Sequence, residues 1–287
     1  MKFDIYQMVT DKFIAALEKG CVPWQKTWQT AGALPMNLVT GKAYQGVNTW
    51  LLACAGFSAP YWLTYKQAAA KGGQVKKGEK GFQVVFWNFS ESANKATGKI
   101  DKIPFLRYYT VFNVQQCEGI DYPKPEVKPF DPIESAEKVI ANSPCQPTRA
   151  IGRPSYRPAS DTLSMPVPTD FTTAEEFYST SFHELAHASG HPSRLNRPEI
   201  ADVQPFGSQT YSREELTAEL TAAFLCAETG LDGVFDNSAA YVAGWLSKLK
   251  EDNRAIVTAA GKAQKAANYI LGRNQVAVES QVETAAE

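Results

Sequence analysis

Cysteines are few and long apolar runs are missing from this sequence, and each of these features argues against a class of protein. Five cysteines occur in 287 residues, an odd number, scattered and never in a CxxC pair. This pattern argues against a disulfide framework or a cysteine-bound metal, and it predicts reduced, buried thiols in a cytoplasmic protein. The cysteines stand at positions 21, 54, 117, 145 and 226.

No stretch of the sequence is apolar for long enough to span a bilayer, so we expect no membrane contact. Hydrophobic residues make up 44% of the chain and charged residues 21%, which are the values of a folded globular protein. Asp4 and Asp11 fall inside what would be the apolar core of a secretory leader. We therefore expect a globular protein without such a leader.

Arginine is nearly absent from the first 120 residues, where 13 Lys and one Arg face seven acidic residues, a balance of +7. The remainder carries 15 basic and 23 acidic residues, a balance of −8, while five of the six tryptophans lie in the first part. Residues 121–132, DYPKPEVKPFDP, hold four prolines at this change of sign, which favours an extended linker. The contrast predicts two domains with different partners, residues 1–120 and 133–287, joined by a linker over 121–132.

The first domain is predicted to be α+β. Residues 3–20 have helical periodicity, and Thr64 is placed to cap a short helix. Residues 81–89 and 105–114 are rich in β-branched and aromatic side chains, as is typical of strands. The polar residues 90–104 then predict a long hairpin connection.

The second domain is predicted to be mostly helical. One helix is expected from about Thr173 to a left-handed stop at Gly190, and another over about 213–229, with Gly230 as its stop. Residues 160–168 predict a short edge strand, because prolines interrupt it. An edge strand beside an active site can offer its backbone to an extended substrate.

All three histidines of the chain fall within nine residues, in the stretch FHELAHASGH. In an α-helix, residues four apart lie on one face about 6 Å apart, so His183 and His187 can direct two nitrogens at one ion. Glu184 lies about 100° round the helix, where it can reach a water on that ion. This is the HExxH pattern of zinc peptidases, in which Zn²⁺ lowers the pKa of a bound water and the glutamate accepts its proton. We expect Zn²⁺, or another divalent metal, with Glu184 as the catalytic base.

The third protein ligand is expected from the following helix. Ser193 stands where an HExxHxxGxxH site would have its third histidine, and His191 follows the expected helix end, where packing is its commoner role. Glu215 and Glu219 share one helix face, and either completes a His-His-Glu site. Glu215 stands at a capping-box position, turned back to the amide of Ser212, whereas Glu219 lies among apolar residues where an unpaired carboxylate is costly. We therefore expect Glu219 as the ligand and Glu215 as a partner that orients a histidine.

The first domain combines lysines with aromatic residues. Five lysines crowd into KQAAAKGGQVKKGEKG, at residues 66–81. Lysines neutralise phosphates and exposed rings stack on unpaired bases, a combination that suits single-stranded nucleic acid. A solvated lysine-rich turn has the same composition, so this observation leaves both interpretations open.

The first domain resembles the N-terminal module of ArdC-type plasmid antirestriction proteins, which is also found in the TraC primases of conjugative plasmids. The stretches that carry the resemblance are PWQKTWQ, PMNLVTGKAYQGVNTWLL, YWLTYKQAAAKGGQVKKGEKG, VVFWN and YYTVFNVQQCEGI. The second domain is similar to the metallopeptidase-like domain of that family in FHELAHASGHPSRLNR and YSREELTAELTAAFLCAETG. The resemblance covers nearly the whole chain.

The resemblance implies single-stranded DNA binding by the first domain, a zincin-like second domain, and protection of plasmid DNA from host restriction during conjugation. Within the matching motifs, the residues expected to contact DNA are Trp24, Trp28, Lys42, Tyr44, Asn48, Lys66, Lys76, Lys77 and Lys80. One hypothesis is a DNA-tethered zinc peptidase whose protein substrate belongs to the restriction machinery. The alternative is a non-catalytic protein that coats single-stranded DNA and has a structural or vestigial metal site. A zinc-assisted nuclease is a third hypothesis.

Overall fold

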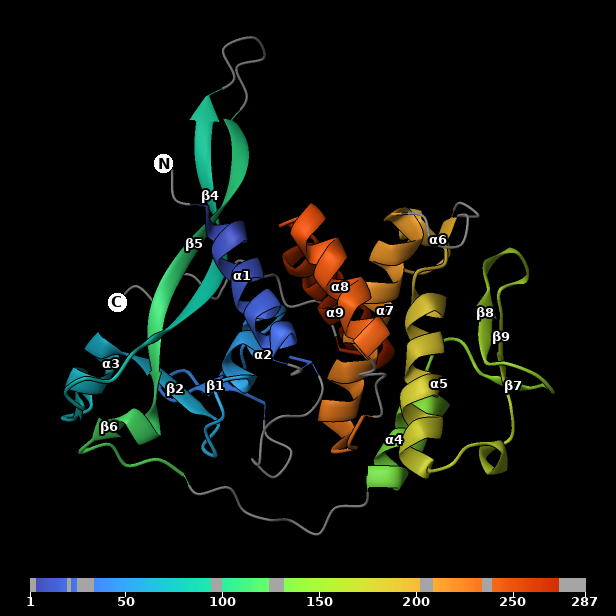
Figure 1. Ribbon diagram of the computed structural model, residues 1–287, viewed down its shortest axis with the longest axis horizontal. Helices are drawn as coiled ribbons and strands as arrows, with labels where there is room; N and C mark the ends of the chain where they lie inside the picture. The colour runs from blue at the N-terminus through green and yellow to red at the C-terminus, as the bar shows by residue number, and fades with distance from the viewer. Residues whose placement is uncertain are drawn as a thin grey trace.

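The N-terminal half builds a mixed sheet with helices beside it, in a computed structural model that describes residues 4–19, 22–24, 34–93, 100–123, 132–201, 209–233 and 239–273. The sheet has the order β1-β2-β5-β4, in which β1 and β2 are parallel and the other pairs antiparallel (Figure 1). The pair β3–β6 forms a second small sheet. The elements are α1 (Ile5–Glu18), β1 (Met36–Asn37), α2 (Val47–Ala53), β2 (Tyr61–Thr64), α3 (Tyr65–Ala70), β3 (Gln74–Val75), β4 (Phe82–Ala93), β5 (Ile100–Asn113), the 3₁₀ turn η1 (Val114–Gln116) and β6 (Cys117–Glu118).

Side chains cap two of the N-terminal helices, α1 and α3. Asp4 caps α1, where its carboxylate accepts a hydrogen bond from the amide of Tyr6 at 2.9 Å. Thr64 caps α3 and makes a reciprocal capping box with Gln67, which confirms its predicted role. Each cap thus defines the N-terminal end of its helix through a hydrogen bond to an amide two or three residues further along the chain.

The hairpin β4–β5 is longer than its sequence predicts. Its register runs without interruption from Phe82 opposite Val111 to Ala93 opposite Ile100. Most of the connection expected over 90–104 is therefore strand, and the prediction of a long loop is wrong. In Figure 1 the far part of the hairpin projects beyond the helices. The sequence of this part, residues 90–93 and 100–104, lacks a regular apolar–polar alternation, so the pattern did not predict strand.

The C-terminal half is mostly helical, as predicted, and α5 and α7 lie side by side in it with α9 packed on both (Figure 1). Among the described helices, none is long and apolar enough to cross a membrane. The elements are α4 (Pro132–Asn142), β7 (Thr148–Arg149), β8 (Ser155–Arg157), η2 (Pro158–Ser160), β9 (Thr162–Met165), η3 (Pro168–Asp170), α5 (Ala174–Ser189), α6 (Pro198–Ala201), α7 (Gln209–Thr229), α8 (Ala239–Glu251) and α9 (Ala255–Ile270).

The strand β9 is central rather than an edge, which corrects the prediction for residues 160–168. It pairs in parallel with β7 and antiparallel with β8, so its backbone groups are used on both sides. Pro166 and Pro168 follow the strand and end it, instead of marking an exposed edge. The outer strands β7 and β8 have only two and three residues, too few for a sequence pattern to reveal.

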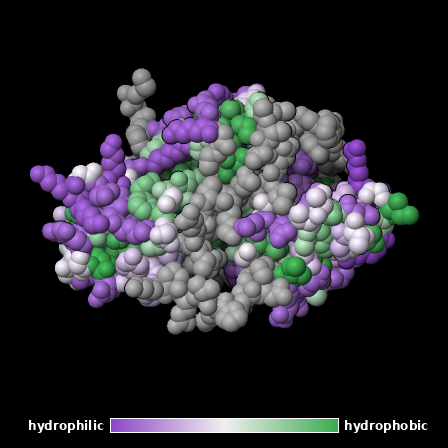
Figure 2. Space-filling view, turned by 60° about the horizontal axis from the view of Figure 1, so that its bottom comes forward, coloured by the Kyte–Doolittle hydropathy of each residue, from purple (hydrophilic) through white to green (hydrophobic). Residues whose placement is uncertain are grey.

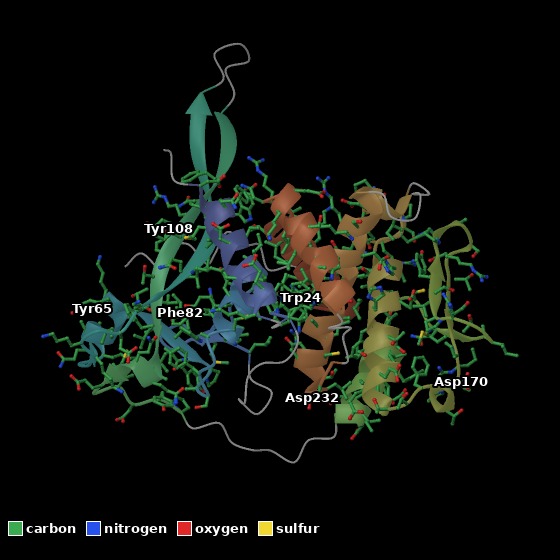
Figure 3. The ribbon with its side chains drawn as sticks, in the orientation of Figure 1. Trp24, Tyr65, Phe82, Tyr108, Asp170 and Asp232 are labelled. Carbon is green, nitrogen blue, oxygen red and sulfur yellow. The ribbon has the colours of Figure 1, made fainter. Side chains whose placement is uncertain are left out.

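One apolar core runs through both halves of the protein. It joins residues of α1 and α2 to residues of α5, α7, α8 and α9. The rings of Trp50 and Phe224 lie 4.7 Å apart, and the ring of Trp24 meets that of Trp245 edge-on at 6.2 Å. Figure 3 shows Trp24 between the N-terminal helices and the α8–α9 pair. The halves are thus packed together directly; of the expected linker, residues 124–131 lie outside the described part of the chain.

Candidate metal centre

The helix α5 places His183 and His187 on consecutive turns that face α7. Thr173, where the helix was predicted to begin, caps it by accepting a hydrogen bond from the amide of Glu176 at 3.1 Å. The opposite face, which includes Phe182 and Leu185, is buried in the core. Burial of this stripe leaves the two imidazoles directed at the neighbouring helix.

Gly190 ends α5, but for a different reason from the one expected. Its φ of −81° is not left-handed, so the prediction of a left-handed stop is wrong. A Cβ at this position would lie 2.8 Å from the guanidinium carbon of Arg197 and 2.8 Å from Ile200. Glycine is needed because the returning chain passes this close to the helix end.

The helix α7 begins at Gln209, about one turn earlier than predicted. Ser212 therefore lies inside the helix, and Glu215 is released from the capping role assigned to it. Gly230 follows the helix with a φ of +67°, which confirms the expected left-handed stop. Glu215 and Glu219, four residues apart on one face of α7, both lie beside His183 of α5.

Two imidazole nitrogens and one carboxylate converge between the helices. The Nε2 atoms of His183 and His187 are 3.1 Å apart. The Glu215 carboxylate lies 3.5 Å from Nε2 of His183 and 3.6 Å from Nε2 of His187. Ligands bound at about 2.1 Å stand about 3.0 Å apart in octahedral and about 3.4 Å apart in tetrahedral coordination. The donor set therefore fits a single divalent ion, and its three side chains form the potential metal-binding group of the described residues.

Glu219 lies behind this group, which contradicts its choice over Glu215 as the third ligand. Its carboxylate is 3.5 Å from Nδ1 of His183, the ring nitrogen that faces away from the convergence point. The hydroxyl of Tyr241 donates a hydrogen bond of 2.6 Å to the same carboxylate. Burial and then the charge of Glu219 raise the pKa of Tyr241, so this hydroxyl keeps its proton. Glu219 is thus placed to orient His183.

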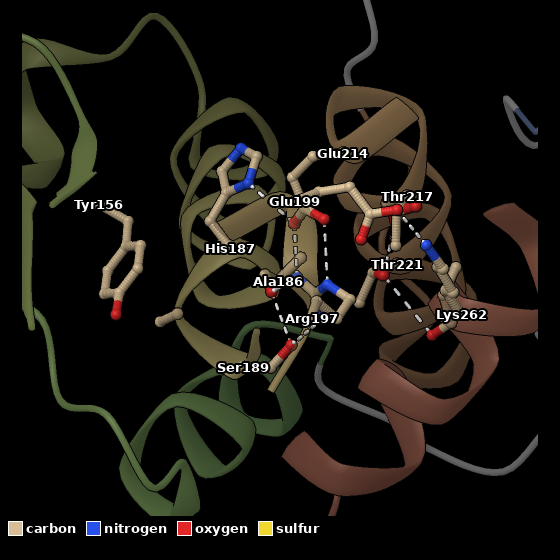
Figure 4. Close-up of polar contacts among 12 residues, drawn as sticks. Tyr156, Ala186, His187, Ser189, Arg197, Glu199, Glu214, Thr217, Thr221 and Lys262 are labelled. Atoms are coloured by element: carbon tan, nitrogen blue, oxygen red, sulfur yellow. Dashed lines mark hydrogen bonds and ion pairs between the residues drawn. The ribbon is translucent and has the colours of Figure 1, made fainter. Parts of the chain in front are cut away.

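A buried ion pair performs the matching task for His187, as Figure 4 shows. Nδ1 of His187 lies 3.3 Å from the Glu214 carboxylate, which accepts two hydrogen bonds from Arg197, at 2.6 and 3.0 Å. Arg197 also donates to the hydroxyl of Ser189 and to the carbonyl of Ala186. Burial would raise the pKa of Glu214, but His187 and Arg197 lower it, so the group stays ionised.

Glu214 and Arg197 were not predicted from the sequence. Glu214 stands next to Glu215 in a helix whose predicted start was wrong. The sequence therefore did not show that the Glu214 side chain points at His187. Arg197 lies beyond a turn, 10 residues after His187, where no helical spacing applies. The one available signal was the pair of adjacent glutamates, since ligating histidines almost always have an acceptor on their second nitrogen.

The charge around His183 is strongly negative. Burial would lower the pKa of His183, but Glu215 and Glu219, followed by Glu184, raise it to about 10. The metal-free imidazole is therefore protonated at neutral pH, and a divalent cation would replace that proton. Glu184 is half-buried one residue along the helix, close enough for its charge to act on His183.

His191 lies outside this group, in keeping with the role in packing that its position favours. Its Nδ1 is 2.7 Å from the hydroxyl of Ser193 and 3.9 Å from the carboxylate of Asp161. Arg194 pairs with the same Asp161. The histidine therefore stabilises the turn after α5.

The structure divides the residues expected to contact DNA into two groups. Trp24, Tyr44 and Asn48 are buried, with only 1%, 6% and 4% of their surface exposed, so they are unavailable for stacking or phosphate contact as the structure stands. Asn48 instead exchanges two hydrogen bonds of 2.7 Å with the backbone of Val85. Their assignment as direct contacts is contradicted by this burial, and Trp28 lies outside the described residues.

The predicted lysines are exposed. They are Lys42, Lys66, Lys76, Lys77 and Lys80. In Figure 2 hydrophilic side chains project from the end of the molecule that carries α3 and β3. The charge expected for a nucleic-acid surface is therefore accessible on the N-terminal half.

The helix pair, its imidazoles and its carboxylates define a zincin-like domain that suits a divalent metal. Residues 134–262 match the family model described as a zincin-like metallopeptidase, and residues 3–112 match that of the N-terminal domain of the anti-restriction factor ArdC. The metal-free crystal structure of the antirestriction protein ArdC from the R388 plasmid is 37% identical, with a TM-score of 0.75 over 95% of this chain and 100% of that one. Its Mn(II)-bound structure is 38% identical, with a TM-score of 0.75 over 94% and 98% of the two chains. The chain belongs to the ArdC family of antirestriction proteins.

Other relatives extend the comparison. The uncharacterised protein y4eC of Sinorhizobium fredii (strain NBRC 101917 / NGR234) is 38% identical over 99% of this chain and 96% of its own length. Two DNA primases TraC of Escherichia coli are 35% and 37% identical over 98% and 97% of this chain. The chain spans only 28% and 20% of the length of those primases, so it corresponds to one part of each.

Proposed function

We propose that this protein binds single-stranded DNA through its N-terminal half and hydrolyses a peptide bond at the HExxH centre of its C-terminal half. In this way it protects plasmid DNA from host restriction during conjugation, with a component of the restriction machinery as the protein substrate. The division of labour follows the predicted boundaries, with residues 1–120 for DNA, a linker over 121–132 and residues 133–287 for the metal centre. Because incoming plasmid DNA would meet restriction enzymes in the cytoplasm, we expect the protein to act there.

The proposed ligands are His183, His187 and Glu215, with Glu219 and Glu214 as the acceptors that orient the two histidines. Two imidazoles and one carboxylate are a common ligand set of catalytic zinc, which makes Zn²⁺ the proposed ion. The Mn(II) named for the R388 relative makes another divalent ion the alternative. Three protein ligands leave a coordination position open for water or substrate.

A divalent ion bound here supplies a Lewis acid that lowers the pKa of water. Glu184 accepts the proton of the attacking water and delivers it to the leaving amine, as a general base and then a general acid. The observation that carries the proposal is this arrangement of Glu184 beside a three-ligand group. A purely structural site needs no general base and usually closes its fourth position with a protein ligand.

The substitution Glu184→Gln tests the peptidase function, since it keeps the size of the side chain but removes the base. Protection of incoming plasmid DNA should be lost, while metal content and single-stranded DNA affinity stay at the wild-type level. Glu175→Gln, two turns earlier on the same helix, is the matched control and should protect fully. Full protection by Glu184→Gln, with its metal retained, would contradict proteolysis and leave the DNA coat as the function. Release of nucleotides by the purified protein would instead favour a nuclease.

A further inference from the structure

The two faces of the β4–β5 hairpin have different surroundings where it joins the sheet. The pairs Val84–Tyr109 and Phe86–Arg107 stand opposite each other in the register, so these four side chains share one face. On the other face Lys12 of α1 donates a hydrogen bond of 2.6 Å to Gln83. The helix α1 therefore packs on one face of the hairpin, and Phe86 and Tyr109 lie on the opposite face.

A shallow depression lies on this second face, between the strands and the loop that follows β1. This depression, the sheet hollow, is lined among others by Lys42, Tyr44, Thr64, Val84, Phe86 and Tyr109. Its enclosed part is small, about 40 Å³, while the space up to and including its mouth is about 470 Å³. Such a shape admits a flat ring lying on the sheet and would not enclose a bulky ligand.

The floor of the sheet hollow is aromatic and its rim is cationic. The rings of Phe86 and Tyr109 are half-buried and meet at 5.6 Å and 65°. Lys42 is exposed at the rim. Arg107 is exposed and stands opposite Phe86 in the register; it lies beside the hollow rather than in its lining, with its guanidinium 5.3 Å from the centre of the Phe105 ring. Among the described residues, none that line the hollow is acidic. Aromatic rings with a lysine at the rim and an exposed arginine beside them complement a base flanked by phosphates.

We propose that the sheet hollow is the seat of an unpaired nucleobase, which stacks on Tyr109 and Phe86 while its flanking phosphates bind Lys42 and Arg107. This inference rests on the proposed single-stranded DNA binding and names its site. Tyr44, whose ring is buried, supports the floor of the hollow. The motif GKAYQG thus serves DNA binding through Lys42 at the rim and through the packing of Tyr44.

Neighbouring tyrosines on opposite faces of β5 provide the test. Affinity of the full-length chain for a fluorescein-labelled oligothymidine would be measured by anisotropy for wild type, Tyr109→Ala and Tyr108→Ala; Tyr108 is the more exposed ring, at 46%. Loss of one base stack should weaken Tyr109→Ala roughly 5- to 150-fold. Tyr108→Ala should bind within about twofold of wild type, and Tyr109→Phe, which keeps the ring, should bind like wild type.

Two further measurements distinguish loss of the proposed base site from misfolding of the variant and from a general loss of DNA binding. Lys42→Ala and Arg107→Ala should each lower the slope of log affinity against log salt by about one. An oligonucleotide containing 2-aminopurine should have its fluorescence quenched by wild type and by Tyr108→Ala, but less by Tyr109→Ala. Equal losses in Tyr108→Ala and Tyr109→Ala, or no loss in Tyr109→Ala, would overturn the site while DNA binding stands. Failure of wild type to bind single strands would overturn the proposed function itself.

Discussion

Replacing Glu215 by alanine should weaken metal binding more than replacing Glu219, because only Glu215 faces the Nε2 atoms of both histidines. Binding free energies of about 10–16 kcal/mol for four-ligand zinc sites correspond to about 3–4 kcal/mol for each ligand, or roughly 10²–10³-fold in affinity. An orienting partner contributes less, about 10- to 100-fold. We therefore expect Glu215→Ala to lose about 10²–10³-fold and Glu219→Ala about 10- to 100-fold.

Competition with a chromophoric chelator on the purified chain would measure these affinities, with circular dichroism as the check on folding. Glu228→Ala is the control on the same helix, because Glu228 pairs with Arg273 at 2.7 Å outside the site and should leave metal affinity unchanged. Tyr241→Phe should have a small loss in the direction of Glu219→Ala, since it removes the hydrogen bond that holds that carboxylate. A larger loss in Glu219→Ala than in Glu215→Ala would refute the assignment.

Three further substitutions test the surrounding structure. Gly190→Ala should destabilise the chain by about 1–3 kcal/mol in urea unfolding, since the added methyl would displace Arg197; unchanged stability would contradict the close approach. The pKa of Asp161 is lowered to about 2, mainly by its hydrogen bond from Arg194, so its contribution to stability is present above about pH 4 and is lost as the pH falls towards 2. The stability difference between wild type and Asp161→Asn should therefore shrink from pH 5 to pH 2.5, and a constant difference would exclude this ion pair as its source. Trp24→Ala should lower the free energy of unfolding by about 3–5 kcal/mol, while the folded variant keeps its affinity for DNA. Loss of DNA binding without loss of stability would show that Trp24 contacts DNA directly.

The parts of the fold and site that are encoded within one helix turn could be read from the sequence. His183 and His187 are related by a fixed helical spacing, and the predicted cap Thr64 acts on a residue three positions away. The third ligand depended on where a second helix begins. The helix begins about one turn earlier than expected, so Glu215 has no capping role, and the distances to the histidines favour Glu215 over Glu219 as the proposed ligand.

The assignment of aromatic residues failed for a different reason. Tryptophan content is the same whether a ring lies in a core or on a binding surface, so composition could not separate Trp24 from an exposed ring. Only the packing of α1 and α2 against α8 and α9 buries Trp24. Conversely, Tyr109 and Phe86 looked like ordinary strand residues, and the register of the hairpin was needed to place them on one face.

The tryptophans at the junction also bear on how such a chain can be inherited. If the chain were cut between residues 123 and 132, each fragment would expose to solvent the aromatic side chains that are buried between the halves. The two fragments would then tend to reassociate through these side chains. Recombination that transfers one half alone would thus deliver an aggregation-prone piece. Inheritance of both halves together avoids this, and the match to a DNA primase TraC spans 98% of this chain, both halves included.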